Sequence, residues 1–177
     1  LMWIFRRATP SFVTNLFRPI QVVAAAFMAF SHGTNDAQKA MGIITMALFA
    51  GGFISEFEVP LWTKIAAATA MALGTSAGGW KIIKTMGSRI VKLQPIHGAA
   101  SDTAAAMTVF TASVYGLPVS TTHVVSGAIM GVGATRRLSA VRWGVAGNMM
   151  LAWVFTIPLT SMVGAGLYNL FRYLFKY

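Results

Sequence analysis

Apolar residues fill most of the chain in long runs, and a short polar segment interrupts the first of them. This run extends over 20–54, and the polar segment within it reads Ser31-His32-Gly33-Thr34-Asn35-Asp36-Ala37-Gln38-Lys39. About 11 apolar residues precede this segment and about 15 follow it, whereas a helix needs about 20 to cross the hydrocarbon core of a bilayer. The pattern therefore predicts one discontinuous transmembrane helix over 20–54, made of two half-helices.

The later apolar runs predict further membrane elements. Transmembrane helices are expected at 61–80 and 143–168. Between them, 95–135 holds two apolar stretches joined by 117–123, and the second stretch is too short to cross a membrane comfortably. We therefore expect a re-entrant helical hairpin, which is tolerated at membrane depth only where protein buries it or where it lines a wet cavity.

The composition indicates lipid as the main solvent. Of 177 residues, 56% are hydrophobic and 10% are charged, against roughly 25% charged in an average soluble domain. Cysteine is absent from the sequence, which excludes disulfides and thiolate metal sites. No base and nucleophile stand at an interpretable spacing, so the sequence does not predict an enzyme. A bound cofactor and a metal site are not expected either.

The positive charge is explained by membrane topology. Lys and Arg number 14 against 4 Asp and Glu, a net charge of +10. They lie between the apolar runs, as the positive-inside rule describes, and do not form the single basic face that nucleic acid would require. Segment 1–19 is accordingly predicted as a cytoplasmic lead-in or interfacial segment, and 81–94 as a basic cytoplasmic loop or amphipathic segment. Nucleic acid is not expected as a partner.

Few ionisable residues fall within the predicted membrane elements. Burial of such a side chain in the bilayer costs free energy, so each is a candidate for function. The candidates away from the predicted interfaces and the hairpin tip are His32, Asp36 and Lys39 in the first polar segment, and His97 and Asp102 at the mouth of the hairpin. Structural roles compete with functional ones. Asp36 and Lys39 have the i,i+3 spacing of an ion pair on one helix face, and each histidine favours a helix-end or packing hydrogen bond.

Two helix starts would direct free backbone N–H groups into the protein interior. Asn35 suits an N-cap with Gln38 three residues later, a variant of the capping box. After Pro118, Ser120 or Thr121 would cap the helix that follows. Helix N-termini placed in this way bind anions, although a run of Ser and Thr in a membrane helix usually bonds to its own backbone.

Interrupted membrane elements with polar helix starts are typical of the midplane binding site of a secondary transporter. The hydroxyl-rich turn suits an anion, and the carboxylates suit a cation or a proton, which predicts symport. An ion channel with re-entrant loops would instead conduct without coupling. A non-transporting membrane subunit would not need Asp36.

The two polar segments resemble the signatures of a known family. Gly33-Thr34-Asn35-Asp36-Ala37-Gln38-Lys39-Ala40 is similar to the Gly-Ala-Asn-Asp-Val-Ala-Asn-Ala signature of inorganic phosphate transporters of the PiT family. The run Gly116-Leu117-Pro118-Val119-Ser120-Thr121-Thr122-His123 resembles that family's second hallmark. In the family the signature occurs twice, in two inverted repeats. The resemblance thus implies that this chain is the C-terminal repeat, with the N-terminal repeat of the same polypeptide as its partner.

The fold class expected from this resemblance is an all-α membrane protein, one inverted-repeat half of a secondary transporter, with a broken helix and a re-entrant helical hairpin. The resemblance also assigns roles to individual residues. It implies phosphate binding by Asn35, Ser120, Thr121 and Thr122, and binding of the coupling cation or proton by Asp36, Lys39 and Asp102.

Lys39 departs from the signature, which has a second Asn at this position. Sodium prefers oxygen ligands, and an ammonium group offers none. We hypothesise that Lys39 occupies the space of a cation and pairs with Asp36, which favours proton-coupled transport of inorganic phosphate or of a neutral complex of phosphate with a divalent metal. Sodium-coupled phosphate symport and a sulfate permease of the same fold are the alternatives.

The resemblance also implies where the protein is found. Bacterial members of the family suggest an integral protein of the bacterial inner membrane, surrounded by the lipid bilayer. Homo-oligomers are compatible with this interpretation.

Overall fold

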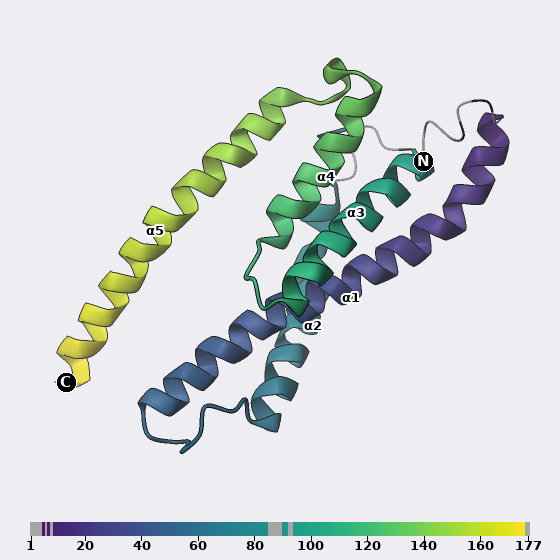
Figure 1. Ribbon diagram of the computed structural model, residues 1–177. Helices are drawn as coiled ribbons and strands as arrows, with labels where there is room; N and C mark the ends of the chain where they lie inside the picture. Colours follow the sequence, from purple (N-terminus) through teal and green to yellow (C-terminus); the bar gives the residue numbers. More distant parts are fainter. Residues whose placement is uncertain (1–4, 6, 8, 85–89, 92–93, 176–177) are drawn as a thin grey trace. The chain divides into compact units, whose positions relative to one another are not determined.

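A computed structural model describes residues 5, 7, 9–84, 90–91 and 94–175, and the regular elements of this part of the chain are helices (Figure 1). They are α1 (Pro10–Ala50), α2 (Leu61–Lys84), α3 (Pro95–Val114), α4 (Thr121–Arg136), the short 3-10 helix η2 (Leu138–Ala140) and α5 (Trp143–Phe175). The chain forms two compact units, Leu1–Val141 and Arg142–Tyr177. The all-α class predicted from the sequence is confirmed.

The first helix, α1, continues through the polar segment without interruption, so the predicted break between two half-helices is wrong. The hydroxyl groups of this segment bond to carbonyls of the same helix. Ser31 Oγ donates to Phe27 O at 2.8 Å, and Thr34 Oγ1 donates to Ser31 O at 2.9 Å. Because these hydroxyls are satisfied within the helix, they do not force the backbone open. Asn35, expected as an N-cap, therefore lies in mid-helix.

The start of α1 also differs from the prediction, since the helix begins at Pro10 and not at residue 20. Proline at a first helical position removes only a donor that has no partner there. Pro19, in the helix interior, costs about 3 kcal/mol. Against this cost, Phe17 is buried in an apolar cluster with Ile96 and Ala99 of α3, which keeps the first turns of α1 helical.

Helices α1 and α3 run side by side in the same direction. Near the start of α3, Gln21 of α1 occupies the space that a side chain at Gly98 would fill, and further along the rings of Phe27 and Phe110 lie 5.7 Å apart. Small residues on the buried face of α3 permit this close approach: Gly98, Ala99, Ser101, Ala105, Ala106 and Ala112. The starts of α1 and α3 thus share one end of the unit, the end for which the sequence predicts the cytoplasm (Figure 1).

Helices α3 and α4 form a hairpin whose turn is set by glycine and proline. The N–H of Leu117 donates to Ala112 O at 2.8 Å, and that of Gly116 donates to Ser113 O at 3.2 Å. Gly116 has φ +68°, a left-handed conformation that glycine adopts without steric cost. Pro118 then prevents the helix from continuing. With 16 residues, α4 spans about 24 Å, less than the hydrocarbon core. Re-entry of this hairpin into the membrane stays a prediction.

Among the described residues, α1 and α5 are each long and apolar enough to cross a membrane. The predicted span 143–168 lies within α5, and the predicted span 61–80 lies within α2. Large apolar side chains are exposed on both long helices, for example Val22 and Val23 on α1 and Ile157 on α5. A surface of this kind suits lipid and not water. The structure therefore indicates a membrane protein.

Candidate functional site

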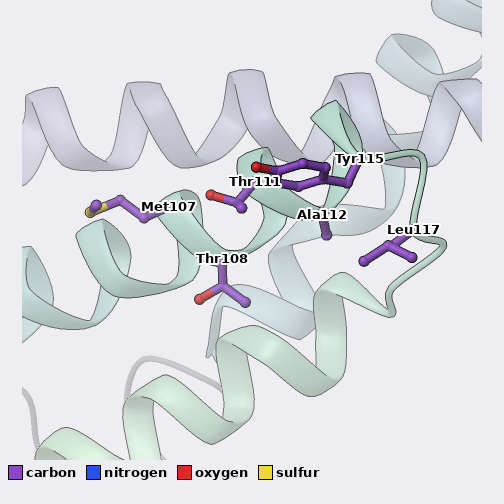
Figure 2. Close-up of a pocket in the computed structure, with 6 residues that line it drawn as sticks. All are labelled: Met107, Thr108, Thr111, Ala112, Tyr115 and Leu117. Atoms are coloured by element: carbon purple, nitrogen blue, oxygen red, sulfur yellow. The ribbon is translucent and has the colours of Figure 1, made fainter.

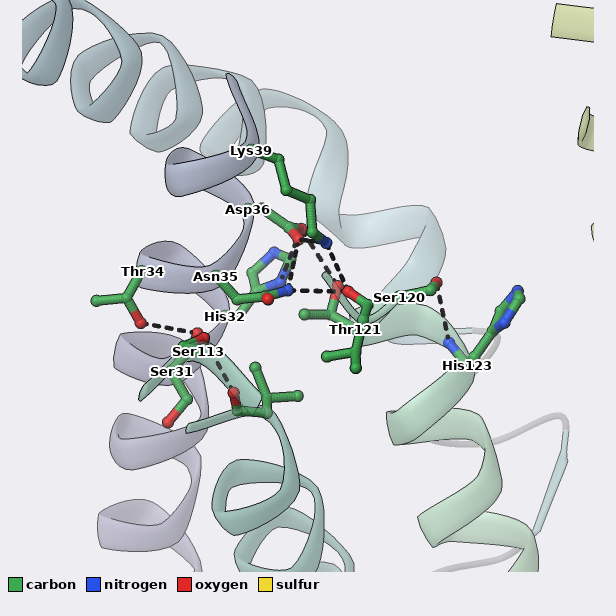
Figure 3. A network of polar contacts seen from close by, with 12 residues as sticks. Ser31, His32, Thr34, Asn35, Asp36, Lys39, Ser113, Ser120, Thr121 and His123 are labelled. Atoms are coloured by element: carbon green, nitrogen blue, oxygen red, sulfur yellow. Dashed lines mark hydrogen bonds and ion pairs between the residues drawn. The ribbon is translucent and has the colours of Figure 1, made fainter. Parts of the chain in front are cut away.

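Asp36, in the polar segment of α1, is the centre of a cluster of polar side chains (Figure 3). Its Oδ1 accepts hydrogen bonds from Asn35 Nδ2 at 3.0 Å and from Lys39 Nζ at 2.9 Å. Its Oδ2 accepts one from Thr121 Oγ1 at 3.2 Å and lies 3.2 Å from His32 Nδ1. The carboxylate is thus held by side chains of its own helix and by the first residue of α4.

The hairpin turn is tied to the same cluster through a backbone carbonyl. Val119 O accepts a hydrogen bond from Asn35 Nδ2 at 3.0 Å and another from Lys39 Nζ. Asn35 is only 2% exposed, so its amide bridges the Asp36 carboxylate and the turn away from bulk water. Because the same two side chains hold the carboxylate and the turn, a change in the charge of Asp36 acts on both.

The N-terminus of α4 lies beside this carboxylate. Ser120 is the N-cap of α4, and its Oγ accepts a hydrogen bond from His123 N–H at 3.4 Å. Thr121 follows it and is 6% exposed. The first N–H groups of a helix lack partners within the helix and give this end a partial positive charge. The end of α4 therefore favours a negative group, which is Asp36 here.

A cavity of about 410 Å³ lies between α1 and the hairpin turn. We call it the turn cavity. Helix α1 lines it with Asn35, Gln38 and Lys39, and the hairpin lines it with Ser113, Val114, Gly116, Leu117 and Pro118. Its volume falls in the range of small-molecule sites. Both N–H groups of the Asn35 amide are given to Asp36 and Val119. The third N–H of Lys39 and the amide of Gln38 are therefore the donors of this lining that suit a small anion.

Another hollow, of about 460 Å³, lies on α3 and the turn (Figure 2). Its lining includes Met107, Thr108, Tyr115 and Leu117. Because none of its lining residues is acidic or basic, it supplies no charge for an ion, and we assign it no part in ion binding.

The structure brings together most of the site residues predicted from the sequence. Asn35, Asp36, Lys39 and Thr121 contact one another or the same groups, and Ser120 is the neighbour of Thr121. The i,i+3 ion pair of Asp36 with Lys39 is observed at 2.9 Å.

Two predicted residues lie outside this cluster. Thr122 is exposed, and its carbonyl accepts a hydrogen bond from Ser126 Oγ. Asp102 is half-buried on α3, about 18 Å along the helix from Val114. His97 has the predicted helix-end role, since its Nδ1 accepts a hydrogen bond from Gln94 N–H at 3.3 Å.

The contact of Asp36 with His32 and the contacts of Asn35 and Lys39 with Val119 O are among those that were not predicted. The contact with His32 could have been found, because i,i+4 spacing puts both residues on one helix face. The carbonyl of Val119 gave no signal, because every residue carries one.

Comparison with known proteins identifies the family. The profile of the phosphate transporter family matches residues 5–164. The chain belongs to the phosphate transporter family. The family resemblance seen in the two polar motifs is thereby confirmed.

This phosphate transporter family member is similar in sequence to several named proteins. A probable low-affinity inorganic phosphate transporter of Rhizobium meliloti is 52% identical over 92% of this chain and 49% of its own length. One of Bacillus subtilis is 47% identical over 97% of this chain and 52% of its own length. The sodium-dependent phosphate transporter 1-B of Xenopus laevis is 34% identical over 91% of this chain and 24% of its own length.

A solved structure, titled the sodium-dependent phosphate transporter, has the same fold as this family member. It matches with a TM-score of 0.80 and 34% identity, over 90% of this chain and 41% of that chain. The chain spans about half the length of the two bacterial relatives named above.

Proposed function

We propose that this chain is the C-terminal repeat of a secondary transporter that imports inorganic phosphate by cation symport. One observation carries the proposal. The Asp36 carboxylate of α1 is bonded to Lys39 of the same helix and to Thr121 of the hairpin, and its partner Lys39 lines a cavity with amide side chains. Family membership and the half-length match to inorganic phosphate transporters support it.

Coupling follows from the charges of Asp36 and Lys39. While Asp36 is ionised, the Lys39 ammonium is paired with it, and the carboxylate repels a phosphate dianion in the turn cavity. When Asp36 takes up a proton, this repulsion ends and the ammonium becomes available to phosphate. Phosphate therefore binds best with the proton, and movement of one repeat against the other carries both across the membrane.

The hydroxyl groups at the start of α4 are the second part of the proposed phosphate site. Ser120, Thr121 and Thr122 occupy the cap and first turn of α4, where a bound anion is also favoured by the helix end. Asp102, on α3, is proposed as a secondary position for the coupling ion. In this arrangement the hairpin re-enters the bacterial inner membrane, with its turn facing the N-terminal repeat.

Two coupling ions are candidates, and the position of Lys39 favours the proton. Lys39 Nζ lies 2.9 Å from Asp36 Oδ1, where a sodium ion would need a free oxygen. Sodium is the second candidate, because one relative and one solved structure are named as sodium-dependent. A neutral complex of phosphate with a divalent metal would also lessen the repulsion by Asp36 and is a candidate cargo.

The test is uptake of radiolabelled phosphate by the full-length protein in proteoliposomes, with a proton gradient or a sodium gradient imposed and excess sulfate as competitor. Protein-free liposomes measure leakage. Proton-driven uptake that sulfate does not inhibit is expected. Uptake that needs sodium would refute the role given to Lys39, and inhibition by sulfate would favour the sulfate permease. Absence of uptake under either gradient would refute the transport assignment.

A further inference from the structure

A second cavity reaches the Asp36 cluster from another side. It has a volume of about 460 Å³ and lies between α1 and α2, so we call it the α1–α2 cavity. His32 lines it from α1, and Ala72, Thr75 and Ser76 line it from α2. It shares no lining residue with the turn cavity. The proposed phosphate site makes no use of it.

Asp36 stands between the two cavities, with one oxygen connected to each. Oδ1 accepts from Asn35 and Lys39, and both of these line the turn cavity. Oδ2 lies 3.2 Å from Nδ1 of His32, which lines the α1–α2 cavity. Figure 3 shows the imidazole and the ammonium at this one carboxylate. The carboxylate can therefore be reached through His32 without passing through the phosphate cavity.

We propose that the α1–α2 cavity is a water-filled route for the coupling proton and that His32 passes this proton to Asp36. The inference rests on the function proposed above. In the transfer, a hydronium ion that enters the cavity from solution gives a proton to His32 Nε2 and becomes water, and the proton on Nδ1 moves to Asp36 Oδ2. Asp36 becomes neutral, and the imidazole stays neutral with its proton on Nε2 in place of Nδ1. Reversal of these steps releases the proton and restores the first tautomer.

The surroundings of His32 support this assignment. The lining of the α1–α2 cavity contains no other titratable side chain, so a proton that enters it meets His32 first. Much of the lining consists of alanine, and the hydroxyl groups of Thr75 and Ser76, with the imidazole of His32, supply the hydrogen-bond partners that water needs there. On α1, Lys39 already donates to Asp36 and to Val119, and α4 presents Thr121, whose hydroxyl does not titrate. Imidazole has two distinct nitrogens, one of which can accept a proton while the other donates one, as a relay requires.

The first test replaces the relay while keeping a hydrogen bond to Asp36. In His32→Gln the side-chain amide can donate to Oδ2 but cannot pass a proton on. A positioned proton-transfer group typically contributes about 100-fold or more, so proton-driven phosphate uptake by the full-length protein should fall by at least about tenfold. Exchange of phosphate across the membrane at equal pH should fall much less, because the loaded carrier can exchange phosphate while Asp36 keeps its proton. Equal losses of uptake and exchange, or uptake within about twofold of the parent, would refute the relay.

The second test asks whether water fills the α1–α2 cavity. Single cysteines are placed in a cysteine-free background at Ala72, inside the cavity, and at Leu73, the next residue, which is 65% exposed and does not line it. A charged thiol reagent that cannot cross membranes should modify Ala72→Cys and block its proton-driven uptake, relative to the same variant untreated. Leu73→Cys should resist modification. Equal labelling at both positions, or none at residue 72, would refute the route.

The two proposals fail in different ways. If the unmodified protein shows no proton-driven phosphate uptake, the function proposed above is wrong. If it shows such uptake and either test fails, only the proton route is wrong. Should His32→Gln prevent folding, seen as loss of the protein from the purified fraction, the cysteine pair decides.

Discussion

The hydrogen bond from Thr121 to Asp36 joins the hairpin to α1, and its contribution to stability can be isolated with a double-mutant cycle. The cycle combines Thr121→Val, which keeps the shape of the side chain, with Asp36→Asn, which removes the charge. The bond is 3.2 Å long, Thr121 is 6% exposed and the Asp36 side chain is 26% exposed. The partners therefore lie largely out of water.

The expected coupling energy follows from these values. Hydrogen bonds to charged groups contribute about 1.5–3 kcal/mol and neutral ones about 0.5–1.5 kcal/mol, so loss of the charge should remove about 1 kcal/mol. This magnitude lies below the largest couplings measured between side chains in a membrane protein, about 1.7 kcal/mol.

The assay is denaturant titration of the full-length protein in detergent, applied to the parent, the two single variants and the double variant. The free energies of unfolding should deviate from additivity by about 1 kcal/mol. Thr122→Val, at the exposed neighbouring threonine, is the matched control and should combine with Asp36→Asn additively within about 0.5 kcal/mol. Additive behaviour of Thr121→Val, or equal coupling in the control, would refute the contact as a link between the elements.

Further substitutions test the other parts of the site. Asp36→Asn should abolish proton-driven phosphate uptake, and uptake with an unchanged pH dependence would exclude Asp36 from coupling. Lys39→Asn restores an oxygen ligand and should make uptake respond to sodium, measured against choline; an unaltered response would contradict the role of Lys39. Ser120→Ala should raise the KM for phosphate about fivefold, the loss of about 1 kcal/mol, and an unchanged KM would remove Ser120 from the site. Gly116→Ala should cost about 1–2 kcal/mol of stability because of its positive φ, seen as a lower Tm, whereas Gly127→Ala, a helical position with open space, should not lower it.

The polar site positions were predictable from the sequence because an ionisable side chain in lipid costs free energy. An ionisable side chain within an apolar run needs a partner, and this requirement selected Asp36 and Lys39. The hairpin was predictable from its turn residues, since Gly116 and Pro118 end one helix before Ser120 caps the next.

The continuity of α1 was not predictable from the same pattern. A polar segment within an apolar run can open the backbone or bond to it, and the composition is the same in both cases. The distances decide, since Ser31 Oγ lies 2.8 Å from the carbonyl one turn earlier. Likewise, no sequence feature shows that Thr121 reaches Asp36 while Thr122 stays exposed, because this depends on how the turn presents α4 to α1.

The hairpin turn ends beside Lys39, whereas α1 continues for about 16 Å to Ala50. If α1 crosses the membrane as predicted, an ion that approaches Asp36 from that end crosses part of the thickness over which the membrane voltage falls. One elementary charge moved through a full 100 mV gains or loses about 2.3 kcal/mol, so a site at half depth senses about 1.2 kcal/mol, close to an eightfold change in affinity. If Asp36 takes up the coupling proton from outside, as proposed above, its occupancy by the proton depends on voltage, and an interior-negative potential favours that uptake before any helix moves.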